Sequence, residues 1–116
     1  MVVLDKTLIN PAQNNFIDLF NLMLHRAVAE KLREDAKPVL QIARNNLNRW
    51  LKKNENSALL EWRQILETRT PEEIIKIISQ DTDEGQRLRS SSPFAGVLSE
   101  AEREKIWSEC AEIRPV

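Results

Sequence analysis

The sequence predicts an all-α fold, a single compact domain of five to six helices with one long N-terminal helix at its centre. Three observations support this prediction. Leu, Glu, Ile, Arg and Ala are among the most frequent residues, while the chain has only two glycines and no tyrosine, a composition that favours helix over strand. Apolar residues recur at helical spacing through most of the chain. Residues typical of helix starts stand before several of these periodic stretches.

Length and composition indicate an ordinary globular protein. We expect residues 1–116 to fold as one domain, because a chain of this size buries about two-thirds of its unfolded surface without disulfides or metal. The one cysteine, Cys110, excludes an intrachain disulfide and is expected to be a buried helix residue. No apolar run is long enough to span a membrane, and the early Asp5 is not typical of a signal peptide. A cytoplasmic protein with no membrane partner is the default expectation.

The long helix follows a short N-terminal segment. Residues 1–9 alternate weakly and are expected to form a frayed tail or a short extended arm. Asn10 and Pro11 mark a helix start, with Asn10 as the cap and Pro11 in the first turn. The helix is expected to run to about Asp35. Its apolar stripe is broad, so we expect neighbours on more than one side.

Two shorter helices are expected next. Pro38 restarts the helical pattern, and the second helix runs to about Lys53. The third spans about Ser57 to Glu67. Charge is unevenly placed: residues 1–54 hold nine Lys or Arg and five Asp or Glu, whereas the remainder holds eight and thirteen. This dipolar distribution bears on partners and orientation rather than on fold.

The clearest local signal in the sequence predicts the start of a fourth helix. Thr70, Pro71 and Glu73 form a capping box with proline at the first helical position. Four isoleucines follow within five residues, at positions 74–78, and this run also fits a buried strand. The capping box and the absence of a partner strand favour a helix.

Two more helices and a turn complete the prediction. Asp81 and Glu84 have the D-x-x-E spacing of a second capping box, with Asp81 as the expected cap of a short helix that ends near Ser90. Gly85 in its first turn indicates close packing or a bend. A turn follows around Pro93, with Phe94 pointing inward. Ser99 then begins a third capping box, S-E-A-E, and a last helix that runs to about residue 112.

A pattern in the second half of the sequence resembles a family of small bacterial and cyanobacterial proteins of unassigned function. It consists of an E-W-R helix at residues 61–63, then E-G-x-R-L-R-x-S-S-P-F-x-G-x-L from Glu84 to Leu98. The resemblance implies a bacterial, all-helical protein. It implies no activity, cofactor or catalytic residue, and the first 55 residues take no part in it.

No signature of catalysis is present. His25 is the only histidine and lies in the most apolar helix, so we expect a boundary or core residue rather than a general base. The D-T-D-E-G run at residues 81–85 does not match a calcium loop, because its glycine is at the fifth position instead of the sixth. No phosphate-binding loop, zinc spacing or nucleophile elbow occurs. We therefore expect a protein that is not an enzyme and needs no cofactor or metal.

The first candidate binding site is the segment from Gly85 to Gly96. Its arginines and serines are suited to an anion, a phosphate or the carboxylate of a partner. The candidate residues are Arg87, Arg89, Ser91, Ser92 and Phe94. The alternative is structural, with glycine allowing close packing, arginine bonding to carbonyls or carboxylates, and Phe94 as a plug. Phosphorylation of the serines at 90–92 is a third, weaker alternative.

The second candidate site is the basic face of the second helix, formed by Arg44, Asn45, Asn48, Arg49 and Lys52. Arginine and asparagine read base edges, and a helix fits the major groove; with the preceding helix this one would form a helix-turn-helix. A solvated helix face is the alternative, and the acidic pI disfavours DNA. The main functional prediction is an interaction or regulatory module that presents the 85–96 segment or a helix face to a protein partner. A small antitoxin-like DNA-binding regulator is second, and three tryptophans leave self-association open.

Overall fold

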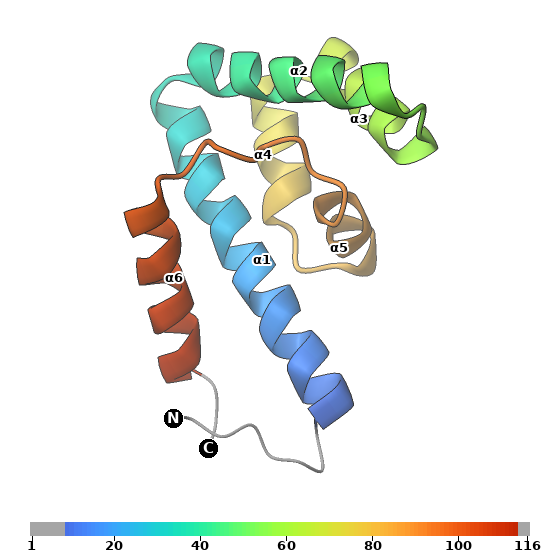
Figure 1. The fold of residues 1–116 in the computed structure, drawn as a ribbon. Helices are drawn as coiled ribbons and strands as arrows, with labels where there is room; N and C mark the ends of the chain where they lie inside the picture. Colours follow the sequence, from blue (N-terminus) through green and yellow to red (C-terminus); the bar gives the residue numbers. More distant parts are fainter. Residues whose placement is uncertain (1–8, 114–116) are drawn as a thin grey trace.

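The longest helix, α1 (Ile9–Glu34), is the element against which most others pack. The computed structural model describes residues 9–113, and the side chains of residues 16–112. Contacts connect α1 with α2 (Ala36–Lys53), α4 (Pro71–Ser79), α5 (Asp83–Arg89) and α6 (Glu100–Ile113). Figure 1 shows α1 running diagonally through the molecule with α6 on one side and α4 on the other. The prediction of a long central helix near the N-terminus is confirmed.

The described residues form six helices and no strand, so the all-α prediction is confirmed. α3 (Ser57–Thr68) packs on α2, and together they form a helical hairpin across one end of α1 (Figure 1). The isoleucine run lies in α4, where Ile74 and Ile78 are fully buried. These two residues are four apart and therefore share one helix face, which turns toward the core.

The first two helix starts differ slightly from the prediction. α1 begins at Ile9, one residue before the expected cap Asn10, whose side chain lies outside the described part. Of the tail or arm expected at residues 1–9, Ile9 is helical instead, and residues 1–8 lie outside the described part. α2 begins at Ala36, two residues before Pro38. Proline is tolerated there because the N–H groups of a first helical turn have no intrahelical partner.

Two of the three predicted capping boxes are formed. The Thr70 hydroxyl accepts from Glu73 N at 3.1 Å, and the Glu73 carboxylate accepts from Thr70 N at 2.9 Å. The Ser99 hydroxyl accepts from Glu102 N at 3.1 Å, and the Glu102 carboxylate accepts from Ser99 N at 2.8 Å. Each box satisfies two backbone donors at a helix start.

The predicted cap of α5 is wrong. α5 begins at Asp83 and its cap is Thr82, whose hydroxyl accepts from Gly85 N at 3.0 Å, instead of Asp81. A threonine hydroxyl accepts the same backbone bond as a carboxylate, although threonine is the slightly weaker cap of the two. The D-x-x-E spacing therefore placed the helix correctly but its cap one residue early.

One core cluster contains buried residues from each of the helices α1 to α6. Trp62, Ala43, Ile74 and Ile78 have no exposed surface, and Leu47 has 2%. Cys110 is also completely buried, as the sequence predicted, and burial raises the pKa of its thiol. In the described part, no helix is both long and apolar enough to cross a membrane.

Candidate functional site

Residues 90–99, here called the connector, link α5 to α6. In Figure 1 the connector passes in front of α4 and α1 on its way to the start of α6. Asn46 of α2 holds it in place, because its side-chain amide donates to Pro93 O and Ala95 O, both at 2.8 Å. The Asn46 carbonyl accepts from Arg49 Nη2 at 2.8 Å. Asn46 is only 6% exposed, and its amide joins the connector to the hairpin of α2 and α3.

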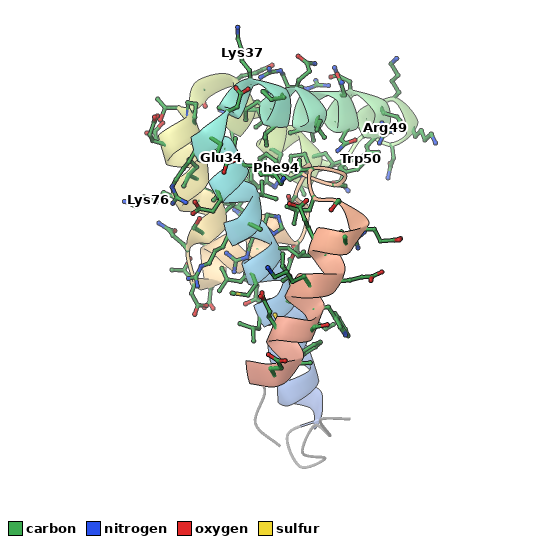
Figure 2. The ribbon with its side chains drawn as sticks, turned by 90° about the vertical axis from the view of Figure 1, so that its left-hand side faces the viewer. Glu34, Lys37, Arg49, Trp50, Lys76 and Phe94 are labelled. Atoms are coloured by element: carbon green, nitrogen blue, oxygen red, sulfur yellow. The ribbon has the colours of Figure 1, made fainter. Side chains whose placement is uncertain are left out.

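Phe94 is the apolar anchor of the connector. Its side chain is buried, as predicted, and lies in the interior beside α1 (Figure 2). Its ring makes an edge contact with Trp62, with centroids 5.7 Å apart, and a more distant one with His25 at 6.5 Å. Trp62 Nε1 donates to Leu88 O at 2.8 Å. One tryptophan therefore contacts both the end of α5 and the connector.

Arg89 is buried, with 4% of its surface exposed. Its Nη1 atom donates to Gln80 O at 2.5 Å and points toward Ile78 O at 3.5 Å, so it caps the C-terminal end of α4. Gly85 makes room for this contact: a Cβ there would lie 2.5 Å from Gln80 O and 2.9 Å from Arg89 Nη1. The close packing predicted at Gly85 is confirmed. Burial lowers the pKa of Arg89, but an arginine stays protonated at neutral pH.

Half of the Arg89 guanidinium has no partner. Its Nε atom is buried and makes no hydrogen bond. Its Nη2 atom is not completely buried, and it makes no hydrogen bond with the described residues. No carboxylate of the described residues forms an ion pair with Arg89. Asp81 and Asp18 act on the Arg89 charge only from beyond ion-pair distance. The buried Nε is therefore an unsatisfied donor that requires an explanation.

Arg87 is exposed and already paired. Its Nη1 and Nη2 atoms bind the two carboxylate oxygens of Glu61 at 3.0 and 2.9 Å, and its Nε and Nη2 atoms bind Glu84 at 2.9 and 2.7 Å. Hydrogen bonds from Arg87 lower the pKa of Glu61 and of Glu84. The pairing joins α3 to α5, and it occupies the donors that a partner's carboxylate would need.

The three serines at residues 90–92 form hydrogen bonds at the C-terminal end of α5. Ser90 donates to Arg87 O at 2.6 Å, and Ser91 Oγ lies 3.5 Å from Leu88 O. The Ser92 hydroxyl accepts from Phe94 N at 3.2 Å, which shapes the turn before the phenylalanine. All three side chains therefore have partners within the helix end and the connector.

A cavity of about 280 Å³ lies between α1, the connector and α6. It brings together three of the five residues predicted for the first candidate site: Arg89, Ser92 and Phe94. Arg87 and Ser91 are not part of its lining. The other residues lining it are Asn21, Leu24, His25, Val28, Ser90, Ala95, Gly96, Leu98 and Arg103.

His25 is the core histidine that the sequence predicted, and it faces this cavity. Its Nδ1 donates to Asn21 O at 2.7 Å, which leaves Nε2 as the unprotonated nitrogen. Burial lowers the pKa of His25 to about 4, so the ring is neutral at pH 7. A hydroxyl or thiol nucleophile does not hydrogen-bond to it, since its one hydrogen bond within the described part is to a carbonyl.

The second candidate site, on α2, is exposed throughout. Arg44, Asn45, Asn48, Arg49 and Lys52 are all on the surface. Two of them are partly occupied, because Asn45 accepts from Gln41 at 2.9 Å and Arg49 binds Asn46 and lies 6.0 Å from the Trp50 ring centre. The helix-turn-helix expectation is not met between α1 and α2, since one residue, Asp35, separates them where such motifs have three or four.

A groove runs between α2 and α3 beside this face. One hollow of about 240 Å³ is lined by Arg44, Leu47, Asn48, Arg63, Leu66 and Glu67. The next, lined by Asn48, Leu51, Lys52 and Arg63, continues it toward the end of α2. We call these residues the basic groove. Among the described residues, Arg44, Lys52 and Arg63 form no ion pair.

Two structural residues were missed by the sequence predictions. Asn46 stands among asparagines assigned to the exposed face, yet it follows Val39 and Ala43 at helical spacing on the buried side. That spacing was a usable signal. Arg63 joins the basic groove from α3, and no local pattern in the sequence links it to α2.

Comparison with protein-family models, curated proteins and solved structures finds no match to this protein. The resemblance to the E-W-R family therefore stays a prediction. Several residues of its pattern contact one another: Glu61 binds Arg87, and Trp62 contacts Leu88 and Phe94. Gly96 has a φ of 87°, which favours glycine. No group of three or more potential metal ligands occurs within the described residues.

Proposed function

We propose that this protein is a non-enzymatic interaction module that binds a partner protein through the basic groove. The observation that carries the proposal is the groove's unpaired charge. Arg44, Lys52 and Arg63 surround it without an ion pair in the described part, whereas Arg87 on the neighbouring surface is held by two carboxylates. Unpaired cations gathered at one groove attract an acidic surface and orient it.

The chemistry of the groove favours an acidic helical segment as the partner. Its walls carry three cations against one acid, Glu67, and its floor is apolar, formed by Leu47, Leu51 and Leu66. A helix in such a groove places an apolar face on the floor and acidic residues against the walls. The uneven charge of the protein supports the α2 wall of the groove as the attracting one, because residues 1–54 carry an excess of base whereas the α3 wall belongs to the acidic half.

Charge reversal tests the proposal. The double variant Arg44→Glu/Arg63→Glu inverts the groove, and Lys76→Glu/Lys105→Glu is the matched control, since both lysines are exposed and lie on other helices. Proteins that bind the wild type and the control but not the groove variant are purified and titrated by calorimetry. We expect binding at least about tenfold weaker for the groove variant, and weaker binding at higher salt.

A second step separates a specific groove from a general charge effect. Acidic residues of the purified partner are changed to lysine, and one such change is expected to restore binding to Arg44→Glu/Arg63→Glu. Equal affinity of the partner for the groove variant and the wild type would reject the basic groove as the binding site. Equal loss in the control variant would indicate nonspecific attraction.

Nucleic acid is the second candidate, favoured by the absence of any acidic residue between Lys37 and Lys53. In Figure 2 Lys37 projects outward from the beginning of α2, and Arg49 lies toward its end. A duplex or single-stranded oligonucleotide would then bind with an affinity that falls steeply with salt and is lost in Arg44→Glu/Arg49→Glu. The anisotropy of a fluorescent oligonucleotide, titrated with the protein at low salt, tests this candidate. An unchanged anisotropy would reject nucleic-acid binding.

We further propose a cytoplasmic, bacterial protein, as the single cysteine and the family resemblance suggest. Self-association is part of the same proposal, because Trp107 of α6 is 45% exposed although it packs against Phe16 and Phe20. Sedimentation at several concentrations tests it: a constant monomer mass would reject self-association.

A further inference from the structure

We propose that the cavity between α1, the connector and α6 binds a carboxylate through Arg89 and Arg103. This site is separate from the basic groove, which lies between α2 and α3, and it does not depend on the function proposed for that groove. The proposal begins with the free edge of Arg89.

The Nε and Nη2 atoms of an arginine form the edge that pairs with both oxygens of one carboxylate. In Arg89 this edge has no hydrogen bond to the described residues, while Nη1 is fixed by Gln80 O. The fixed half holds the guanidinium in place, and the buried Nε keeps the desolvation penalty of a hydrogen bond that is not made. Arg89 is 4% exposed and lines the cavity, so a small ligand in the cavity is well placed to supply the missing partner.

The lining of the cavity has the charge that an anion requires. It contains two arginines and no acidic residue. Arg103 enters from α6, is exposed, and forms no ion pair within the described residues. The Ser92 hydroxyl accepts from Phe94 N, so its own hydrogen remains available to donate.

Size and polarity favour a carboxylate on a short apolar tail. The volume of about 280 Å³ lies just below the range of about 300–1,000 Å³ typical of drug-sized ligands. Leu24, Val28 and Leu98 give the cavity an apolar wall beside the arginines. A phosphate would place its charge against that wall, whereas an aliphatic carboxylate matches both parts. The two sources of this group are a free organic acid and the C-terminus of a peptide.

The experiment titrates the full-length protein with butyrate and follows the Arg89 Nε–Hε and Trp62 indole signals by nitrogen-15 NMR. Butyramide is the uncharged control, inorganic phosphate tests the class of anion, and N-acetylleucine represents a peptide C-terminus. We expect saturable shifts with butyrate and none with butyramide. Tighter binding of N-acetylleucine than of butyrate would assign the carboxylate to a peptide end, and the reverse to a free acid.

Variants test the residues. Arg103→Gln leaves the core intact and is expected to weaken butyrate binding about tenfold, while Lys105→Gln, on the same helix and outside the cavity, is expected to leave it unchanged. Arg89→Lys keeps the charge but loses the two-atom edge, so binding should no longer saturate. Circular dichroism checks its fold, and if it unfolds, Arg103→Gln decides alone.

The proposal fails on several outcomes. It is overturned if no probe gives a saturable shift, if butyramide binds as tightly as butyrate, or if Arg103→Gln keeps the wild-type affinity. Tighter binding of phosphate than of any carboxylate would overturn the assigned class. Arg44→Glu/Arg63→Glu should bind butyrate normally, so failure at the cavity and failure at the basic groove are distinguishable.

Discussion

The connector side of the molecule and the outer face of α2 carry the same kinds of side chain in opposite environments. Arg89 and Asn46 are buried and bind backbone carbonyls of the α4 end and of the connector. Arg44 and Asn48 are exposed and line the basic groove. Residue type alone would not separate the two pairs, and only their neighbours do.

The difference has an energetic reason. Burying an amide or a guanidinium removes its hydration, which is tolerable only if hydrogen bonds replace it. Asn46 recovers that loss with two carbonyls and one arginine, whereas Arg89 recovers it only in part. Polar groups on the outer face of α2 keep their water and are available to a partner. Substitutions should therefore affect stability on one side and binding on the other.

The largest effect is expected at Trp62. Replacing this fully buried side chain in Trp62→Ala should lower the free energy of unfolding by about 3–5 kcal/mol, measured by urea denaturation. Trp107→Ala is the control and should lose less, because Trp107 is 45% exposed. Equal losses for the two variants would contradict the assignment of Trp62 to the centre of the core.

The second largest loss of stability is expected at Asn46. Asn46→Ala leaves Pro93 O and Ala95 O without their side-chain donor, and we expect a loss of about 2–3 kcal/mol in the free energy of unfolding. Asn48→Ala, two positions further along α2, should change it by less than about 0.5 kcal/mol. If the two variants were equally stable, the connector would not depend on α2.

Much of the fold could be predicted from the sequence. Helix number, the central α1, the inward Phe94 and two capping boxes followed from local rules of spacing, proline and caps. Such signals act within a few residues of one another. The cap at Thr82 was missed because two candidate caps were adjacent and only backbone geometry chose between them.

The candidate sites were harder to predict because their partners are distant in sequence. Arg87 and Arg89 are two residues apart in one motif, yet one binds Glu61 on the surface and the other caps α4 in the interior. The bond from Asn46 to Pro93 spans 47 positions. Contacts of this range depend on how the helices pack, and no local periodicity reports them.

The next prediction concerns the buried side and the dependence of its stability on pH. Its expected effect on the free energy of unfolding is smaller than that of Asn46→Ala. The pKa of His25 is about 4 in the folded protein, against about 6.5 in the unfolded state, because burial disfavours the charged ring. The unfolded state therefore binds the proton first, and stability falls as the pH is lowered through 6.5. Between pH 7 and pH 5, above the usual range of carboxyl groups, we expect a loss of about 2 kcal/mol.

His25→Gln provides the control for this titration. This variant should be less stable than the wild type at pH 7. Its free energy of unfolding, measured by urea denaturation at each pH, should change little between pH 7 and pH 5. The same slope in both proteins would mean that another group titrates in this range and that His25 is not the buried neutral ring.

The smallest change in the free energy of unfolding is expected on the exposed face of α2. A small change there would show that Arg44 has no structural role. Arg44→Gln removes a charge that forms no ion pair among the described residues, so the free energy of unfolding should change by less than about 0.5 kcal/mol. The same variant should weaken the partner bound at the basic groove, because the lost cation faces that partner. Urea denaturation measures the first quantity and calorimetry the second. A clear loss of stability would show that Arg44 belongs with Arg89 as a structural arginine, and the division between the two sides of the molecule would then fail at its exposed end.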